Sequence, residues 1–256
     1  MVNRHNRSVP VEVRVIPLLG LPELGEGDDL AELLADACGR AGGLEEGDVV
    51  VVAQKAVSKV EGRTVRLDEI EPSARAIELA GDEGDPRQVE VILRETVEVV
   101  RSRPPLVISQ TSHGFVCASA GVDASNTGGP GTVILLPVDP DASAARLRAG
   151  LADLTGIEPG IIVSDSFGRA WRQGTTDVAL GVSGIVALRD LRGTTDSRGY
   201  ELRSTMIAVA DEIAGAAELV MGKANGVPAA IVRGVDAAGE GRAADIVMPR
   251  ERDLFR

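Results

Sequence analysis

Strand-like and helix-like segments follow one another along this chain without strict alternation. Apolar or alternating runs predict strands at residues 11–16, 49–53, 63–67, 106–109, 115–118, 132–138, 160–163, 178–185 and 229–232. Helical spacing and capping signals predict helices at residues 28–41, 85–100, 142–154 and 202–221. A doubly wound parallel sheet would require regular alternation, so the order favours an α+β fold with mixed sheets and flanking helices.

The length and composition limit how such a fold is built. A chain of 256 residues can form one large domain or two small ones, each with a substantial core. Aromatic residues make up only 2% of the chain, so Val, Ile, Leu and Ala must supply that core. Residues 1–10 are basic and polar, which predicts a loose N-terminal tail, and no signal-type apolar segment follows them. With no run long enough for a membrane span, the expected location is cytoplasmic and away from membranes.

Charge and cysteine content exclude several classes of partner. The formal net charge of −12 argues against nucleic-acid binding, which depends on clustered Lys and Arg. The net charge does not exclude a phosphorylated small molecule as a ligand, because such a ligand needs only a local positive group or a bound cation. Cys38 and Cys117 are far apart and form no CxxC, so neither a disulfide scaffold nor a zinc site is expected.

Two short segments each place an aspartate after a strand-like run. Asp123 lies in Gly121–Asn126, after residues 115–118, and Asp165 lies in Ser164–Arg169, after residues 160–163. If the fold brings the two carboxylates together, they can hold a hard divalent cation with nearby hydroxyl and amide oxygens. The alternative is ordinary turn chemistry, because Asp and Ser side chains readily bond their own backbone.

Lysine is rare in this chain, which draws attention to Lys55, Lys59 and Lys223, its only three lysines. A compact ammonium suits a phosphate group, and Lys59 is the preferred candidate for that role. Solvated loop lysines are the alternative. Arg169 can clamp a carboxylate or phosphate, and Trp171 is expected to pack or to stack on a flat ring. Neither the P-loop pattern nor the dinucleotide fingerprint is present.

These residues belong to ordered blocks that resemble one family over nearly the full chain, that of coenzyme F420-0:γ-glutamyl ligase. The matching blocks are residues 20–24, 26–30, 47–52, 57–63, 120–126, 136–141, 164–169, 208–214 and 232–234. The resemblance implies a GTP-dependent ligase that attaches L-glutamate to coenzyme F420-0 and then adds γ-linked glutamates through an acyl phosphate. It also implies Mg²⁺ or Mn²⁺ (two ions), K⁺ in some members, and a homodimer. Residues 11–256 would form the ligase domain, with two intertwined subdomains.

The resemblance also carries over site residues. It implies metal ligands at Asp123, Asp165 and Ser166, and catalytic roles for Lys59 and Arg169. The positions that match GTP contacts are Leu21, Pro22, Glu23, Leu24, Gln54, Lys59, Asn126, Met221, Gly222 and Lys223. Two positions depart from the family pattern. Gln54 stands where a Ser is expected, and Lys223 stands where archaeal members place a carboxylate or amide metal ligand.

Two other functions use the same residues. One is a metal-dependent phosphohydrolase or phosphotransferase built on the two aspartates, and the other is a non-catalytic GTP-binding module. The paired aspartates and the scarce lysines are compatible with the ligase and with both of these alternatives. Only the family resemblance selects the ligase. Whether the chain acts alone or within a fusion to a reductase-like domain is left open.

Overall fold

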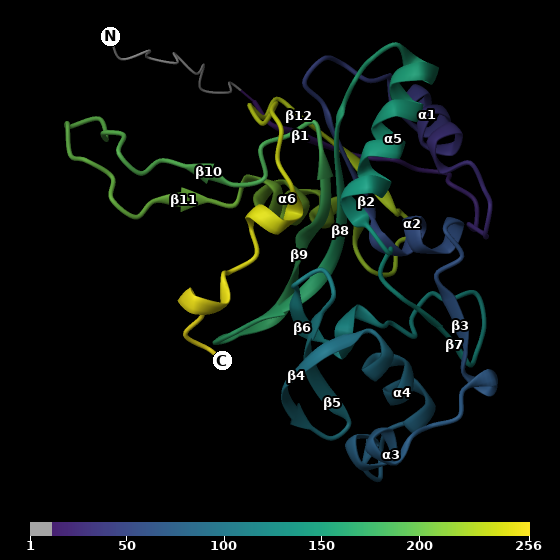
Figure 1. The fold of residues 1–256 in the computed structure, drawn as a ribbon. Coiled ribbons are helices and arrows are strands. Elements are labelled where there is room, and N and C mark those ends of the chain that lie inside the picture. The colour runs from purple at the N-terminus through teal and green to yellow at the C-terminus, as the bar shows by residue number, and fades with distance from the viewer. Residues whose placement is uncertain (1–11) are drawn as a thin grey trace.

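A five-stranded mixed sheet forms the centre of the structure, a computed structural model that describes residues 12–256 (Figure 1). In spatial order its strands are β1 (Arg14–Pro17), β12 (Ala229–Arg233), β2 (Val49–Ala53), β8 (Gly160–Arg169) and β9 (Arg172–Ser183). Only β2 and β8 run parallel; the other neighbours are antiparallel. The mixed sheet confirms the α+β prediction. The expected tail at residues 1–10 lies outside the described residues.

Helices cover both faces of this sheet. Helices α1 (Leu30–Arg40) and α5 (Pro140–Thr155) pack on one face, and α6 (Val209–Met221) packs on the other (Figure 1). Successive strand residues point to opposite faces, so Val50 and Val52 join the α1–α5 core whereas Val49 and Val51 join the α6 core. A strand buried on both sides explains the continuous apolar run of β2.

Local capping explains where several helices begin. Asp29 accepts a hydrogen bond from the backbone N–H of Glu32 at 3.0 Å at the start of α1. Asp139 caps α5 in the same way, with Pro140 at the first helical position. An aspartate at this position satisfies a backbone N–H that the helix leaves unpaired, and proline loses nothing there. The cap-plus-proline prediction for residues 139–140 is therefore confirmed.

A second apolar core lies below the central sheet in Figure 1. Its helices are α3 (Ala74–Ala80) and α4 (Pro86–Arg94), and its sheet contains β4 (Thr96–Arg103), β5 (Leu106–Thr111) and β6 (Val116–Ala118). A separate strand pair, β3 (Thr64–Arg66) and β7 (Thr132–Ile134), runs between the two regions. A division into two subdomains with defined boundaries stays a prediction.

The remaining elements are short. Helix α2 (Gln54–Val60) follows β2 directly, and β10 (Arg189–Asp190) pairs with β11 (Met206–Ile207) in an arm that projects from the body (Figure 1). The 3₁₀ turns are η1 (Leu67–Glu69), η2 (Ser119–Gly121), η3 (Ala243–Asp245) and η4 (Arg250–Arg252). None of the described helices combines the length and apolarity needed to cross a bilayer.

Several predicted boundaries are wrong. The helix expected at residues 85–100 ends at Arg94, and residues 96–103 form β4 instead, because their β-branched side chains pair with β5. The helix expected from residue 202 begins at Val209. Strand β7 ends at Ile134 rather than at residue 138, and α3 was not predicted. Strand β8 continues to Arg169, so Asp165 lies within a strand and not in a loop.

The tip of the β8–β9 hairpin carries Trp171 in a left-handed conformation, with φ of 62°. Its side chain is 89% exposed, and its ring lies 6.0 Å from that of Phe255, centroid to centroid. The expectation that Trp171 packs into the protein is therefore wrong.

Candidate active site

A cavity of about 420 Å³ lies at the edge of the central sheet where β2 ends. Parallel pairing sets Ala53 of β2 opposite Ser164 of β8, and Ala53 also donates its backbone N–H to Pro228 just before β12. Helix α2 and the segment after α6 therefore meet the middle of β8 at one place. The predicted residues that line this cavity are Leu21, Pro22, Glu23, Leu24, Gln54, Lys59, Asn126, Asp165, Ser166, Met221, Gly222 and Lys223.

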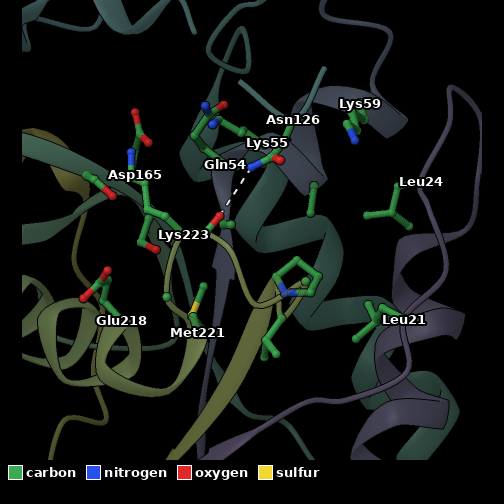
Figure 2. A pocket seen from close by; sticks show the side chains of 18 of the residues that line it. Leu21, Leu24, Gln54, Lys55, Lys59, Asn126, Asp165, Glu218, Met221 and Lys223 are labelled. Atoms are coloured by element: carbon green, nitrogen blue, oxygen red, sulfur yellow. Dashed lines mark hydrogen bonds between the residues drawn. The ribbon is translucent and has the colours of Figure 1, made fainter. Parts of the chain in front are cut away.

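The cavity has an apolar side and a charged side. Figure 2 shows Leu21 and Leu24 on one side, with Asp165 and Glu218 opposite them. Asn126 donates from Nδ2 to the backbone oxygen of Lys223 at 3.4 Å and so joins two loops across the rim. Such a cavity suits a ligand with an apolar part and a charged part.

Asp123 holds an ion pair with Lys55 beside the cavity. The Lys55 Nζ lies 2.6 Å from Asp123 Oδ2 and donates to Ser125 Oγ at 2.7 Å. The other oxygen, Asp123 Oδ1, accepts the backbone N–H of Ser125 at 2.7 Å. Burial alone would raise the pKa of Asp123, but the hydrogen bonds from Lys55 and Ser125 hold this pKa below its ordinary value. Asp123 is therefore an ionised carboxylate with both oxygens engaged.

Asp165 has the opposite electrostatic character. Burial raises the pKa of Asp165 to about 6, against weaker lowering effects from the Ser166 backbone N–H, Lys223 and Lys55. A buried carboxylate that is short of positive charge gains from a nearby cation. Asp165 and Asp123 supply the hard carboxylate oxygens that a divalent metal prefers. The described residues contain no cluster of three or more His, Cys, Asp or Glu arranged to hold one, so a shared metal at these two residues stays a prediction.

Two further polar residues of the cavity are Glu23, which contacts the last turn of α2, and Gln54, which begins that helix. Lys59 pairs with Glu23, whose side chain is largely exposed. Gln54 is 1% exposed, and its Oε1 accepts from Ser58 Oγ at 2.9 Å, while its Nε2 has no hydrogen-bond partner among the described residues. A buried donor without a partner is costly, so Gln54 gains from a ligand oxygen in the cavity.

Comparison with known proteins decides the family. The family model described as F420-0:Gamma-glutamyl ligase matches residues 19–234 of this chain. The chain belongs to the F420-0:γ-glutamyl ligase family.

Three full-length relatives agree with this assignment, each named coenzyme F420:L-glutamate ligase. The protein from Methanopyrus kandleri is 48% identical over 255 residues, which cover 97% of this chain and 96% of the relative. The protein from Methanothermobacter thermautotrophicus is 43% identical over 95% of this chain and 99% of the relative. The protein from Methanocaldococcus jannaschii is 44% identical over 96% of this chain and 98% of the relative.

Two residues predicted for this family's site do not line the cavity. Asp123 lies behind Lys55, which does line it, and Arg169 occupies the exposed end of the β8–β9 hairpin. A catalytic role for Arg169 stays a prediction, as do the metal-binding and GTP-binding roles of the other residues.

Asp177 is a cavity residue that the sequence alone does not identify. It is 5% exposed on β9 and accepts hydrogen bonds from Ser164 Oγ at 2.9 Å and Ser166 Oγ at 2.7 Å. A hydroxyl that donates its proton in this way keeps its lone pairs for a cation, so the bond leaves the predicted role of Ser166 open. No sequence signal marks Asp177, because only the pairing of β8 with β9 brings it opposite Ser166.

Proposed function

We propose that this protein is a GTP-dependent ligase that adds L-glutamate to coenzyme F420-0 and then extends the product through γ-linkages. Relatives that match almost end to end carry the name coenzyme F420:L-glutamate ligase, which supports glutamate addition in coenzyme F420 biosynthesis. The observation that carries the GTP assignment is the single cavity edge that gathers Lys55, Lys59 and Lys223 beside Asp165. A homodimeric, cytoplasmic enzyme, with K⁺ as an additional cation, is part of the same proposal.

The proposed chemistry proceeds in two balanced steps. A carboxylate oxygen of F420-0 attacks the γ-phosphorus of GTP, which forms an acyl phosphate and releases GDP. The amine of glutamate then attacks the acyl carbon, loses a proton and expels inorganic phosphate, which leaves an amide. A carboxylate is a poor electrophile, so the first step supplies the leaving group for the second.

The residues of the cavity serve positioning and charge compensation in this scheme. Leu21 and Leu24 offer an apolar surface to a flat ring, whereas Lys59 and Lys223 offer ammonium groups to phosphates. Asp123, Asp165 and Ser166 would hold Mg²⁺ or Mn²⁺. When bound, that metal supplies compensation for the negative charge of the transferred phosphoryl group.

Product masses test the proposal directly. The protein is incubated with F420-0, GTP, Mn²⁺ and L-glutamate, and the products are read by mass spectrometry. A ladder of glutamate-sized increments supports the ligase, and unchanged F420-0 overturns it. GTP hydrolysis without F420-0 and glutamate would point instead to a phosphohydrolase, and GTP binding without turnover would point to a binding module.

Substitution of Lys223 tests its proposed contact with the phosphates of GTP. We expect Lys223→Ala to weaken GTP binding by about 10-fold to 100-fold, because a charge-assisted hydrogen bond contributes roughly 1.5–3 kcal/mol. Calorimetric titration with GTP and Mg²⁺ measures the change, together with turnover. Lys223→Arg keeps the positive charge and should retain most of the affinity. Unchanged affinity and turnover in Lys223→Ala would remove this residue from the phosphate site.

A further inference from the structure

Lys55 pairs its positive charge with Asp123 at the border of the cavity. Its Nζ contacts Asp123 Oδ2 at 2.6 Å and Ser125 Oγ at 2.7 Å, and its charge also acts on Asp165. The side chain is 17% exposed and lines the cavity, so it borders the space that a ligand would enter. An ammonium so placed has the charge sign and the oxygen contacts of a bound cation.

We propose that Lys55 is a built-in counter-ion that blocks divalent-metal binding at Asp123 until a nucleotide enters the cavity and draws its ammonium away. The inference rests on the proposed function only in taking a nucleoside triphosphate as the ligand. It adds an order to binding: nucleotide and metal enter together, and metal alone binds weakly.

The contacts of Asp123 explain why the metal must compete. Oδ2 is held by Lys55 and Oδ1 by the backbone N–H of Ser125, so neither oxygen is fully available. A metal ion at Oδ2 would also lie close to the ammonium, and two cations a few ångströms apart repel strongly in a partly buried site. Lys55 must therefore leave Asp123 before a metal binds there.

Nucleotide phosphates give the displaced ammonium a new partner. Lys55 lies on the first turn of α2, beside Gln54 and within the lining of the cavity. A phosphate in that cavity can accept from Lys55 Nζ as a charge-assisted hydrogen bond and so offset the lost ion pair. The same exchange makes metal and nucleotide increase each other's affinity, since a coupling free energy acts equally on both ligands.

Lys59 provides a matched comparison on the same short helix. It lies one turn further along α2, and its ion pair is with Glu23 and not with Asp123. Replacing either lysine with glutamine removes one positive charge and frees one carboxylate. Only the Lys55 substitution frees a carboxylate of the proposed metal site.

Mn²⁺ titration followed by electron paramagnetic resonance tests the inference on the full chain without nucleotide. We expect Lys55→Gln to bind Mn²⁺ at least about 10-fold more tightly than the unaltered protein, which corresponds to loss of a competing charged contact. Lys59→Gln should leave Mn²⁺ affinity unchanged. Equal or weaker Mn²⁺ binding by Lys55→Gln would overturn the inference.

Two further measurements locate the effect and its coupling. The gain should vanish in the double variant Lys55→Gln/Asp123→Asn; a gain that persists there places the metal elsewhere and overturns the inference. A non-hydrolysable GTP analogue should tighten Mn²⁺ binding by a larger factor in the unaltered protein than in Lys55→Gln. An equal tightening of Mn²⁺ binding in the two proteins would also overturn the inference. Lys55→Met, which keeps the aliphatic stem, should reproduce the gain, and circular dichroism confirms that each variant is folded.

These outcomes are separate from the ligase assay. If Lys55→Gln gains Mn²⁺ affinity while the unaltered protein yields no glutamate ladder, the ligase proposal fails and the counter-ion role stands. If the ladder forms and Mn²⁺ affinity does not change, the counter-ion role fails and the ligase proposal stands.

Discussion

Replacing Asp165 with asparagine is expected to reduce glutamate ligation by about 100-fold or more and, at the same time, to stabilise the metal-free protein at neutral pH. The loss of activity follows from the loss of a carboxylate in the proposed metal site. The gain in stability follows from burial, which makes the ionised form of Asp165 unfavourable when no metal is bound. Opposite effects on activity and stability are typical of a functional carboxylate.

The pH dependence of this stability has a defined sign. The folded-state pKa of Asp165 is about 6, above the ordinary value of 3.8. The fold therefore favours the protonated acid, and that advantage is complete below about pH 4 and disappears as the pH rises through 6. The difference amounts to roughly 3 kcal/mol at most, because each pKa unit corresponds to about 1.4 kcal/mol. Asparagine carries no charge, so Asp165→Asn removes the loss of folding stability that occurs as the pH rises.

Urea unfolding followed by circular dichroism checks the stability effect at pH 4.5 and pH 8. Asp165→Asn should exceed the unaltered protein in stability at pH 8, and the difference should shrink at pH 4.5. Asp153→Asn, on the exposed surface of α5, is the control and should alter neither stability nor ligation. Full ligase activity in Asp165→Asn would remove Asp165 from the metal site.

Gly181→Ala is expected to destabilise the fold by at least about 3 kcal/mol, since backbone clashes in a packed core are among the most costly substitutions. A Cβ at this position of β9 would lie 2.2 Å from the carbonyl oxygen of Pro140, at the start of α5. The contact is with the backbone of Pro140 and not with the flexible end of a side chain. The clash can be relieved only if α5 and the central sheet separate, which would open the α1–α5 core.

Gly168→Ala is the matched control for Gly181→Ala, because both glycines lie on the β8–β9 hairpin. An added Cβ at Gly168 meets no atom within 4 Å, and no left-handed φ is required there. Its free energy of unfolding should stay within about 0.5 kcal/mol of the unaltered protein. Similar urea midpoints for the two variants would show that Gly181 has more room than the structure indicates.

The sequence predicts elements well where one local signal dominates. The apolar run at residues 49–53 and the Asp139-Pro140 cap specify β2 and the start of α5 without any knowledge of their neighbours. Residues 96–100 carry a weaker signal: their β-branched residues favour a strand, but no Gly or Pro separates them from the preceding helix. Pairing with β5 decides their conformation, and that contact is not visible locally.

The candidate site also contains residues that a local sequence signal identifies and residues that only the fold brings together. Asp165 stands out in the sequence because a polar cluster follows an apolar run, and most of the positions carried over from the family do line one cavity. The scarcity of lysine draws attention to Lys59 as a phosphate ligand, but nothing in the sequence places Asp123 beside Lys55. Asp177 could not be recognised either, since its partners Ser164 and Ser166 lie on another strand.

The exposed position of Trp171 determines which optical probe can report on this protein. It is the chain's only tryptophan, and its indole is already surrounded by solvent at the hairpin tip. Its fluorescence emission should therefore shift little when the core unfolds, and it should respond to events at the tip and at Phe255. A tryptophan placed at Leu24, on the apolar side of the cavity, would provide a fluorescent reporter of nucleotide entry that the natural chain lacks.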